Sequence, residues 1–122
     1  MPNNSNQIFR IEYTSEFKRN LRTLAKKYRS IRGDIQPFID HIKSGQFIGN
    51  QVKGVGDIVY KARVKNSDIQ KGKSAGYRVI YWIKTPQDII FITLYSKLDQ
   101  ADISPQQIRR IIRQAEQDVI DE

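Results

Sequence analysis

The sequence of 122 residues contains no cysteine and only one histidine. Without cysteine, the chain can form no disulfide framework, no thiolate nucleophile and no cysteine-ligated metal site. The lone histidine, His41, has no carboxylate cluster at ligand spacing beside it and no support for a Ser-His-Asp arrangement. We therefore expect neither a bound metal nor another cofactor.

Long apolar runs are also missing. No apolar segment reaches the roughly 18 residues that a membrane span needs. The polar start, residues 1–7, lacks the apolar region of a signal peptide. We expect residues 1–7 to form a disordered tail, residues 8–122 to form a single domain, and the protein to act in the cytoplasm without membrane contact.

Acidic residues are scarce over most of the chain. Residues 1–85 hold 17 basic and 6 acidic side chains, whereas residues 86–122 hold 4 basic and 7 acidic ones. A body this basic usually binds a polyanion or an acidic protein. The charge therefore favours a nucleic acid or an acidic protein as the partner.

The hydrophobic periodicity predicts an α+β domain. A short strand at residues 8–13 precedes two amphipathic helices, which we expect to form a hairpin on one face of a sheet. A loop at residues 46–57 then leads to an antiparallel three-stranded region and a C-terminal helix. The pattern predicts a mixed sheet of about four strands.

Polar residues mark the expected helix starts. Thr14 or Ser15 can cap the first helix, and Ser104 with Gln107 forms a capping box for the last. Asp34 is the expected N-cap of the second helix, which would place Pro37 in its first turn.

Basic residues recur at alternating positions of the predicted strands. Lys61, Arg63 and Lys65 share one strand face, Arg78 enters the next strand, and Tyr95 and Lys97 end the third. If the register places these residues on a common face, the sheet presents a dense cationic surface. The alternative is a solvated basic edge that resists aggregation.

The segment Gly72-Lys73-Ser74 invites comparison with a phosphate-binding loop. That loop needs a glycine five residues before the Gly-Lys pair, where Ser67 stands, and a helix after it, where a strand is predicted. We therefore do not interpret the segment as a nucleotide site.

Clustered lysine and arginine suit the cleavage of RNA through its own 2′-hydroxyl. This reaction needs a base, a charge that stabilises the phosphorane, and an acid for the leaving oxygen. Arginine holds a phosphate bidentately, and a lysine crowded by other cations has its pKa lowered towards use in proton transfer. Tyr95 can stack on a base, and we expect it to bind RNA together with Lys53, Lys65 and Lys73.

Four segments resemble the RelE/HigB branch of the RelE/ParE toxin superfamily: 59–63, 72–81, 95–97 and 99–104. These are toxins of bacterial type II toxin–antitoxin modules, and the resemblance covers residues 8–116. It implies a RelE-like fold and a metal-independent endoribonuclease, an mRNA interferase among the hydrolases. Such a toxin cuts mRNA, commonly on the ribosome, inhibits translation and growth, and is silenced by a cognate antitoxin.

The resemblance also implies the catalytic residues. Lys61 and Arg63 match a basic pair, and Arg78 matches the arginine of Gly-Tyr-Arg that contacts the scissile phosphate. Lys97 lies where members place a basic residue, although Leu98 stands where RelE itself has arginine. A tyrosine that some members use after this strand has no clear counterpart, and the region holds Asp99 and Asp102 instead.

Two other functions remain open. The ParE-like branch of the superfamily inhibits DNA gyrase by binding, without nuclease chemistry, and a basic nucleic-acid-binding module would be a simpler role. The presence of Lys61, Arg63 and Arg78 favours the nuclease.

Overall fold

A computed structural model describes residues 9–70 and 72–121, without the side chains of Lys73 and residues 118–121. The tail expected at residues 1–7 lies outside the described residues. The elements are, in order, β1 (Arg10–Tyr13), α1 (Ser15–Lys27), α2 (Ile31–Lys43), β2 (Asn50–Gln51), β3 (Val59–Val64), the 3₁₀ turn η2 (Lys73–Ala75), β4 (Tyr77–Ile83), β5 (Asp88–Ser96) and α3 (Pro105–Asp121).

The strands form one mixed sheet in the order β1-β5-β4-β3-β2. β1 runs parallel to β5, and the remaining neighbours are antiparallel. The predicted α+β class is confirmed, but the sheet has five strands instead of about four. The additional strand, β2, lies in the segment expected to be a loop. The sequence does not indicate this strand, because its two residues are polar and exposed and show no apolar alternation.

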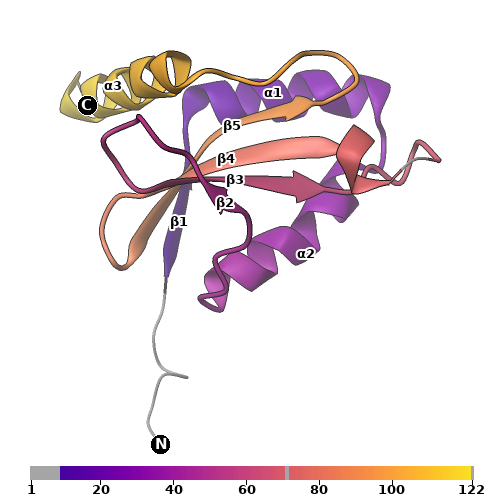
Figure 1. Cartoon of the computed structure of the whole chain (residues 1–122), viewed down its shortest axis with the longest axis horizontal. Coiled ribbons are helices and arrows are strands. Elements are labelled where there is room, and N and C mark those ends of the chain that lie inside the picture. The colour runs from indigo at the N-terminus through magenta and orange to yellow at the C-terminus, as the bar shows by residue number, and fades with distance from the viewer. Residues whose placement is uncertain (1–8, 71, 122) are drawn as a thin grey trace, which may run out of the picture.

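Helices cover both faces of the sheet (Figure 1). The first core lies under α1 and α2, as expected for the helical hairpin, and includes Phe17, Phe38, Tyr81 and Phe91. The second lies under α3 and joins Ile108 and Ile112 to Val59, Ile80, Trp82, Ile90, Ile92 and Tyr95. The α3 face therefore carries Lys61, Arg63 and Arg78, which alternate with residues of the first core.

β5 contains a bulge at Ile92. Tyr81 of β4 pairs with Phe91, whereas Ile80 pairs with Thr93, so Ile92 has no partner in this ladder. Because side chains alternate along a strand, the extra residue changes which side chains face each core. Tyr95 thereby joins Ile90 and Ile92 on the α3 face.

The first and last helix caps agree with the sequence prediction. The Thr14 hydroxyl accepts a hydrogen bond from the Phe17 N–H at 3.0 Å. At α3, the Gln107 N–H donates to the Ser104 hydroxyl, and the Ser104 N–H donates back to the Gln107 side chain. Local sequence is sufficient to specify both caps.

The predicted cap of α2 is wrong. The helix begins at Ile31 with Ser30 at the N-cap position, so Pro37 lies inside the helix and not in its first turn. The Asp34 carboxylate instead accepts hydrogen bonds from the N–H and hydroxyl of Ser67, in the β3–β4 connection. A tertiary contact therefore uses the carboxylate that was expected to cap the helix. None of the helices in the described part of the chain has the length and apolarity to span a membrane.

Candidate functional site

Four basic residues gather on the α3 face, at the end of the sheet where β3 and β5 finish and β4 begins (Figure 1). We call Lys61, Arg63, Arg78 and Lys97 the cationic cluster. Arg63 of β3 lies directly opposite Arg78 of β4, and Arg78 lies opposite Tyr95 of β5. The Lys97 N–H donates to the Gly76 carbonyl at 2.9 Å, which continues the β4–β5 ladder. Three strands thus bring together the four residues predicted to be catalytic.

Gly76 permits this close assembly. A Cβ atom at this position would overlap the Val64 carbonyl oxygen and lie 3.2 Å from the Lys65 Cα. The backbone of Lys65 therefore runs directly beside Gly76, whose carbonyl binds Lys97 on its other side. A side chain at residue 76 would force the two strands apart.

Arg78 is buried, with an exposed fraction of 4%. Its guanidinium donates to the Ser74 carbonyl at 2.9 Å and to the Tyr77 carbonyl at 3.3 Å. A cation on a sheet surface is usually exposed, but the η2 turn supplies a carbonyl acceptor that allows the Arg78 side chain to be buried. The guanidinium is thereby held in one orientation, which is a requirement for preorganised charge stabilisation.

Asp102 connects the two lysines of the cluster. Its Oδ1 accepts a hydrogen bond from Lys97 Nζ at 3.0 Å and forms a salt bridge with Lys61 Nζ at 3.6 Å. The Tyr95 hydroxyl donates to the same oxygen in a long hydrogen bond of 3.4 Å. A single carboxylate oxygen thus contacts donors from β3, β5 and the segment that follows β5.

These contacts determine the charge states of Asp102 and Tyr95 at physiological pH. The hydrogen bond from Lys97 and the charge of Lys61 lower the pKa of the Asp102 carboxyl, so it is ionised. Burial raises the pKa of the Tyr95 phenol, and the charge of Asp102 raises it further, so its proton is retained. Within the described residues, no three side chains of His, Cys, Asp or Glu come together to hold a metal ion.

The remaining predicted RNA-binding residues occupy different positions. Lys65 is exposed beside Gly76, at the border of the cationic cluster. Lys53 follows Val52, which bonds to Val59 at the opposite end of β3, so Lys53 lies away from the cluster. The residue Tyr95 is only 4% exposed, so its ring offers no open face for stacking. The structure does not describe the side chain of Lys73.

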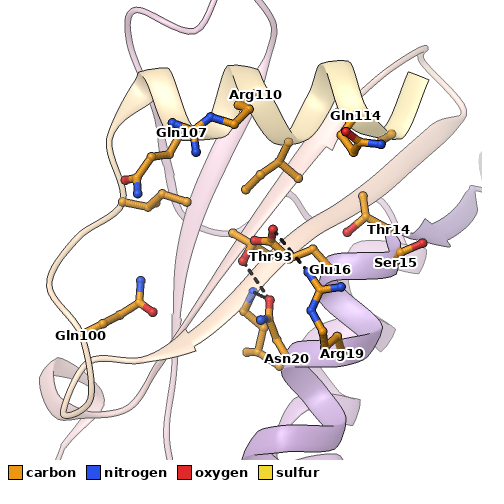
Figure 2. A pocket seen from close by; sticks show the side chains of 14 residues that line it. Thr14, Ser15, Glu16, Arg19, Asn20, Thr93, Gln100, Gln107, Arg110 and Gln114 are labelled. Atoms are coloured by element: carbon orange, nitrogen blue, oxygen red, sulfur yellow. Dashed lines mark hydrogen bonds and ion pairs between the residues drawn. The ribbon is translucent and has the colours of Figure 1, made fainter. Parts of the chain in front are cut away.

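A separate groove of about 560 Å³ runs between α1, the edge of β5 and α3 (Figure 2). At its floor, the Asn20 side chain accepts hydrogen bonds from the Thr93 hydroxyl and the Leu94 N–H. Asn20 thereby binds the edge of β5 beyond the residues that pair with β1. No member of the cationic cluster lines this groove.

The role of Asp102 was not predicted. The sequence shows two acids after β5, and only the structure distinguishes them. Asp99 pairs with Lys27 of α1 at 2.7 Å, whereas Asp102 enters the cationic cluster. No sequence pattern indicates this division, because both acids occur in the same polar connection.

Comparison with known proteins gives one clear match. The family model described as the RelE toxin of the RelE/RelB toxin–antitoxin system matches residues 10–120, nearly the whole chain. No curated protein matches the chain.

Proposed function

The chain belongs to the RelE family of toxins from toxin–antitoxin systems, and we propose that it is an endoribonuclease that cleaves mRNA on the ribosome. Membership of this family makes an antitoxin protein its partner. The observation that carries the proposal is the cationic cluster, in which a buried and oriented arginine lies among three further cations from neighbouring strands. Cleavage in the bacterial cytoplasm would inhibit translation and growth.

The proposed reaction uses the 2′-hydroxyl of the RNA as the nucleophile. Its oxygen forms a bond to the adjacent phosphorus while the bond from phosphorus to the 5′-oxygen breaks. The products are a 2′,3′-cyclic phosphate and a 5′-hydroxyl. One group must accept the 2′-hydroxyl proton and another must donate a proton to the departing 5′-oxygen. No metal ion is required, because protein cations can balance the charge on phosphorus.

We assign stabilisation of that charge to Arg78, because the carbonyls of Ser74 and Tyr77 already hold its guanidinium in place. Arg63 contributes phosphate contact, since arginine stays protonated and cannot act as a base. Lys61, as an ammonium group, donates the proton to the departing 5′-oxygen, a water molecule accepts the 2′-hydroxyl proton, and Lys97 positions the RNA backbone. Both lysines contact Asp102, which keeps their ammonium groups close together.

The RNA would extend from the cluster over Lys65 and the β3–β4 connection that carries Lys73. Lys53, at the other end of β3, would contact only a longer RNA segment. Tyr95 would act through its hydroxyl and not through its ring, because the ring is packed under α3.

Inducible expression with primer extension on a reporter mRNA tests this function. Wild-type protein should produce defined 5′ ends in the transcript, and Lys61→Ala should abolish them. Arg22→Ala is the control, because Arg22 is exposed on α1, on the opposite face of the sheet. Reactions with purified components should be run with translating ribosomes and without them, each in the presence of a chelator.

Loss of cleavage in the chelator, under conditions in which the ribosomes stay intact, would exclude the metal-independent mechanism. Toxicity without cleavage of any transcript, together with inhibition of purified DNA gyrase, would support the ParE-like activity instead. Cleavage only with ribosomes present would establish ribosome dependence.

A further inference from the structure

Asp102 lies where an anionic substrate would bind. Its Oδ1 receives contacts from two ammonium groups and one phenol hydroxyl, the kinds of donor that bind a phosphate oxygen. Lys61 and Lys97 both form their salt bridges with this one oxygen. The carboxylate therefore occupies an anion site formed by Lys61, Lys97 and Tyr95.

We propose that Asp102 is an internal competitor of the RNA phosphate, and that its carboxylate must leave Lys61 and Lys97 before RNA can bind fully. The inference rests on the proposed function only for the identity of the anion as RNA. Displacement of Asp102 frees three donors, all on the face that carries Arg63 and Arg78.

The surrounding chain permits this movement. The Asp102 side chain is 55% exposed, and residues 100–104 contain no helix or strand. Local hydrogen bonds flank the segment: the N–H groups of Asp99 and Gln100 donate to the Ser96 carbonyl on one side, and the Ser104 capping box of α3 lies on the other. A local rearrangement between these two anchors can release the carboxylate without moving α3.

The salt bridges of Asp102 are also weak enough for an RNA phosphate to replace the carboxylate. Lys61, Lys97 and Asp102 are each about one third or more exposed, and exposed salt bridges contribute little to stability. An RNA phosphate can replace the carboxylate and gain additional contacts with Arg63 and neighbouring cations. A small anion has fewer such contacts, so Asp102 selects for polymeric RNA.

Asp102→Asn and Asp99→Asn form a matched pair for the test. Both remove one negative charge from the same connection, but only Asp102 contacts the cationic cluster. Two probes are used with the full chain: inorganic phosphate, followed by thermal shift, and a short 2′-O-methyl RNA that cannot be cleaved, followed by fluorescence anisotropy. Circular dichroism checks that each variant is folded.

We expect Asp102→Asn to bind both probes about threefold to tenfold more tightly than wild type, because two exposed salt bridges no longer compete. Asp99→Asn should change binding less than twofold. Asp102→Ala, which removes the remaining amide oxygen as well, should bind at least as tightly as Asp102→Asn.

Equal effects of Asp102→Asn and Asp99→Asn, or weaker binding by Asp102→Asn, would overturn the proposal. The phosphate measurement does not depend on nuclease activity. If Asp102→Asn gains phosphate affinity while the wild-type protein cleaves no RNA, the internal competitor stands and the proposed function fails. If the wild type cleaves RNA and neither probe responds to Asp102→Asn, the proposed function stands and the competitor fails.

Discussion

Arg63 and Arg78 lie directly opposite each other on adjacent antiparallel strands, so two like charges share one cross-strand pair. Such a pair is destabilising in a sheet. Arg78 is anchored by backbone carbonyls, whereas Arg63 is exposed and makes no salt bridge to any described residue. The pair therefore adds nothing to stability, which agrees with the phosphate-binding role proposed for both arginines.

Replacement of Arg63 should separate stability from activity. We expect Arg63→Thr to raise the free energy of unfolding by about 0.2–1 kcal/mol, because the repulsion is removed and threonine suits a strand. RNA cleavage should fall strongly. Urea unfolding and the reporter-mRNA assay measure the two effects, with Arg22→Ala on α1 as the control. A less stable variant that still cleaves RNA would contradict this expectation.

Replacement of Arg78 should reduce both the stability of the protein and its cleavage of RNA. Arg78→Ala leaves the Ser74 and Tyr77 carbonyls without their guanidinium partner, and the free energy of unfolding should fall by about 1–3 kcal/mol. Cleavage should fall about 10²–10³-fold at a temperature where the variant remains folded. Urea unfolding with single-turnover cleavage provides the measurement. An unchanged unfolding midpoint would show that the guanidinium is not seated on these carbonyls.

Two glycine-to-alanine variants should have opposite effects. In Gly76→Ala the new Cβ would overlap the Val64 carbonyl oxygen, so we expect a large loss of stability as the end of β3 is pushed away. In Gly33→Ala the Cβ meets nothing within 4 Å on an α2 residue, and stability should rise by up to about 1 kcal/mol. Thermal unfolding of the two variants beside the wild type tests the pair, and a tolerated Gly76→Ala would refute the tight contact.

The Arg10–Asp88 pair should make the attachment of β1 dependent on pH. Asp88 accepts a hydrogen bond from Arg10 at 2.6 Å, and this bond, with a second from Thr85, lowers the pKa of Asp88. The stabilisation is therefore complete above the unfolded pKa of about 3.9 and is lost as pH falls through the lower folded pKa. The free energy of unfolding should differ between wild type and Asp88→Asn at pH 7, and the difference should shrink below about pH 4. A difference that is independent of pH would exclude this linkage.

The sequence predicts correctly those features of the fold, such as helix caps, that depend on residues close together in the chain. The caps at Thr14 and Ser104 were predicted correctly because each bond closes within three residues. Asp34 was assigned wrongly because its partner, Ser67, lies in a distant connection. β2 was missed because strand pairing, and not apolar alternation, defines its two residues.

The same division applies to the candidate site. Alternation along β3 placed Lys61 and Arg63 on one face, and antiparallel pairing of the following strands then brought Arg78 beside them. The burial of Arg78 depends on the η2 turn, and the position of Asp102 depends on the path of the chain after β5. Neither property leaves a periodic pattern that sequence reasoning can detect.

The bulge at Ile92 sets the phase of β5. Before the bulge, β5 pairs with β1 on one side and with β4 on the other. After the bulge, β5 pairs with the part of β4 that carries Arg78. If Ile92 were paired and the strand continued without the bulge, strict alternation would turn Leu94 towards α3 and Tyr95 towards α1 and α2, and would exchange the faces of all residues up to Lys97. The apolar pattern of β5 therefore fits both cores only as long as one residue between Phe91 and Leu94 stays unpaired with β4.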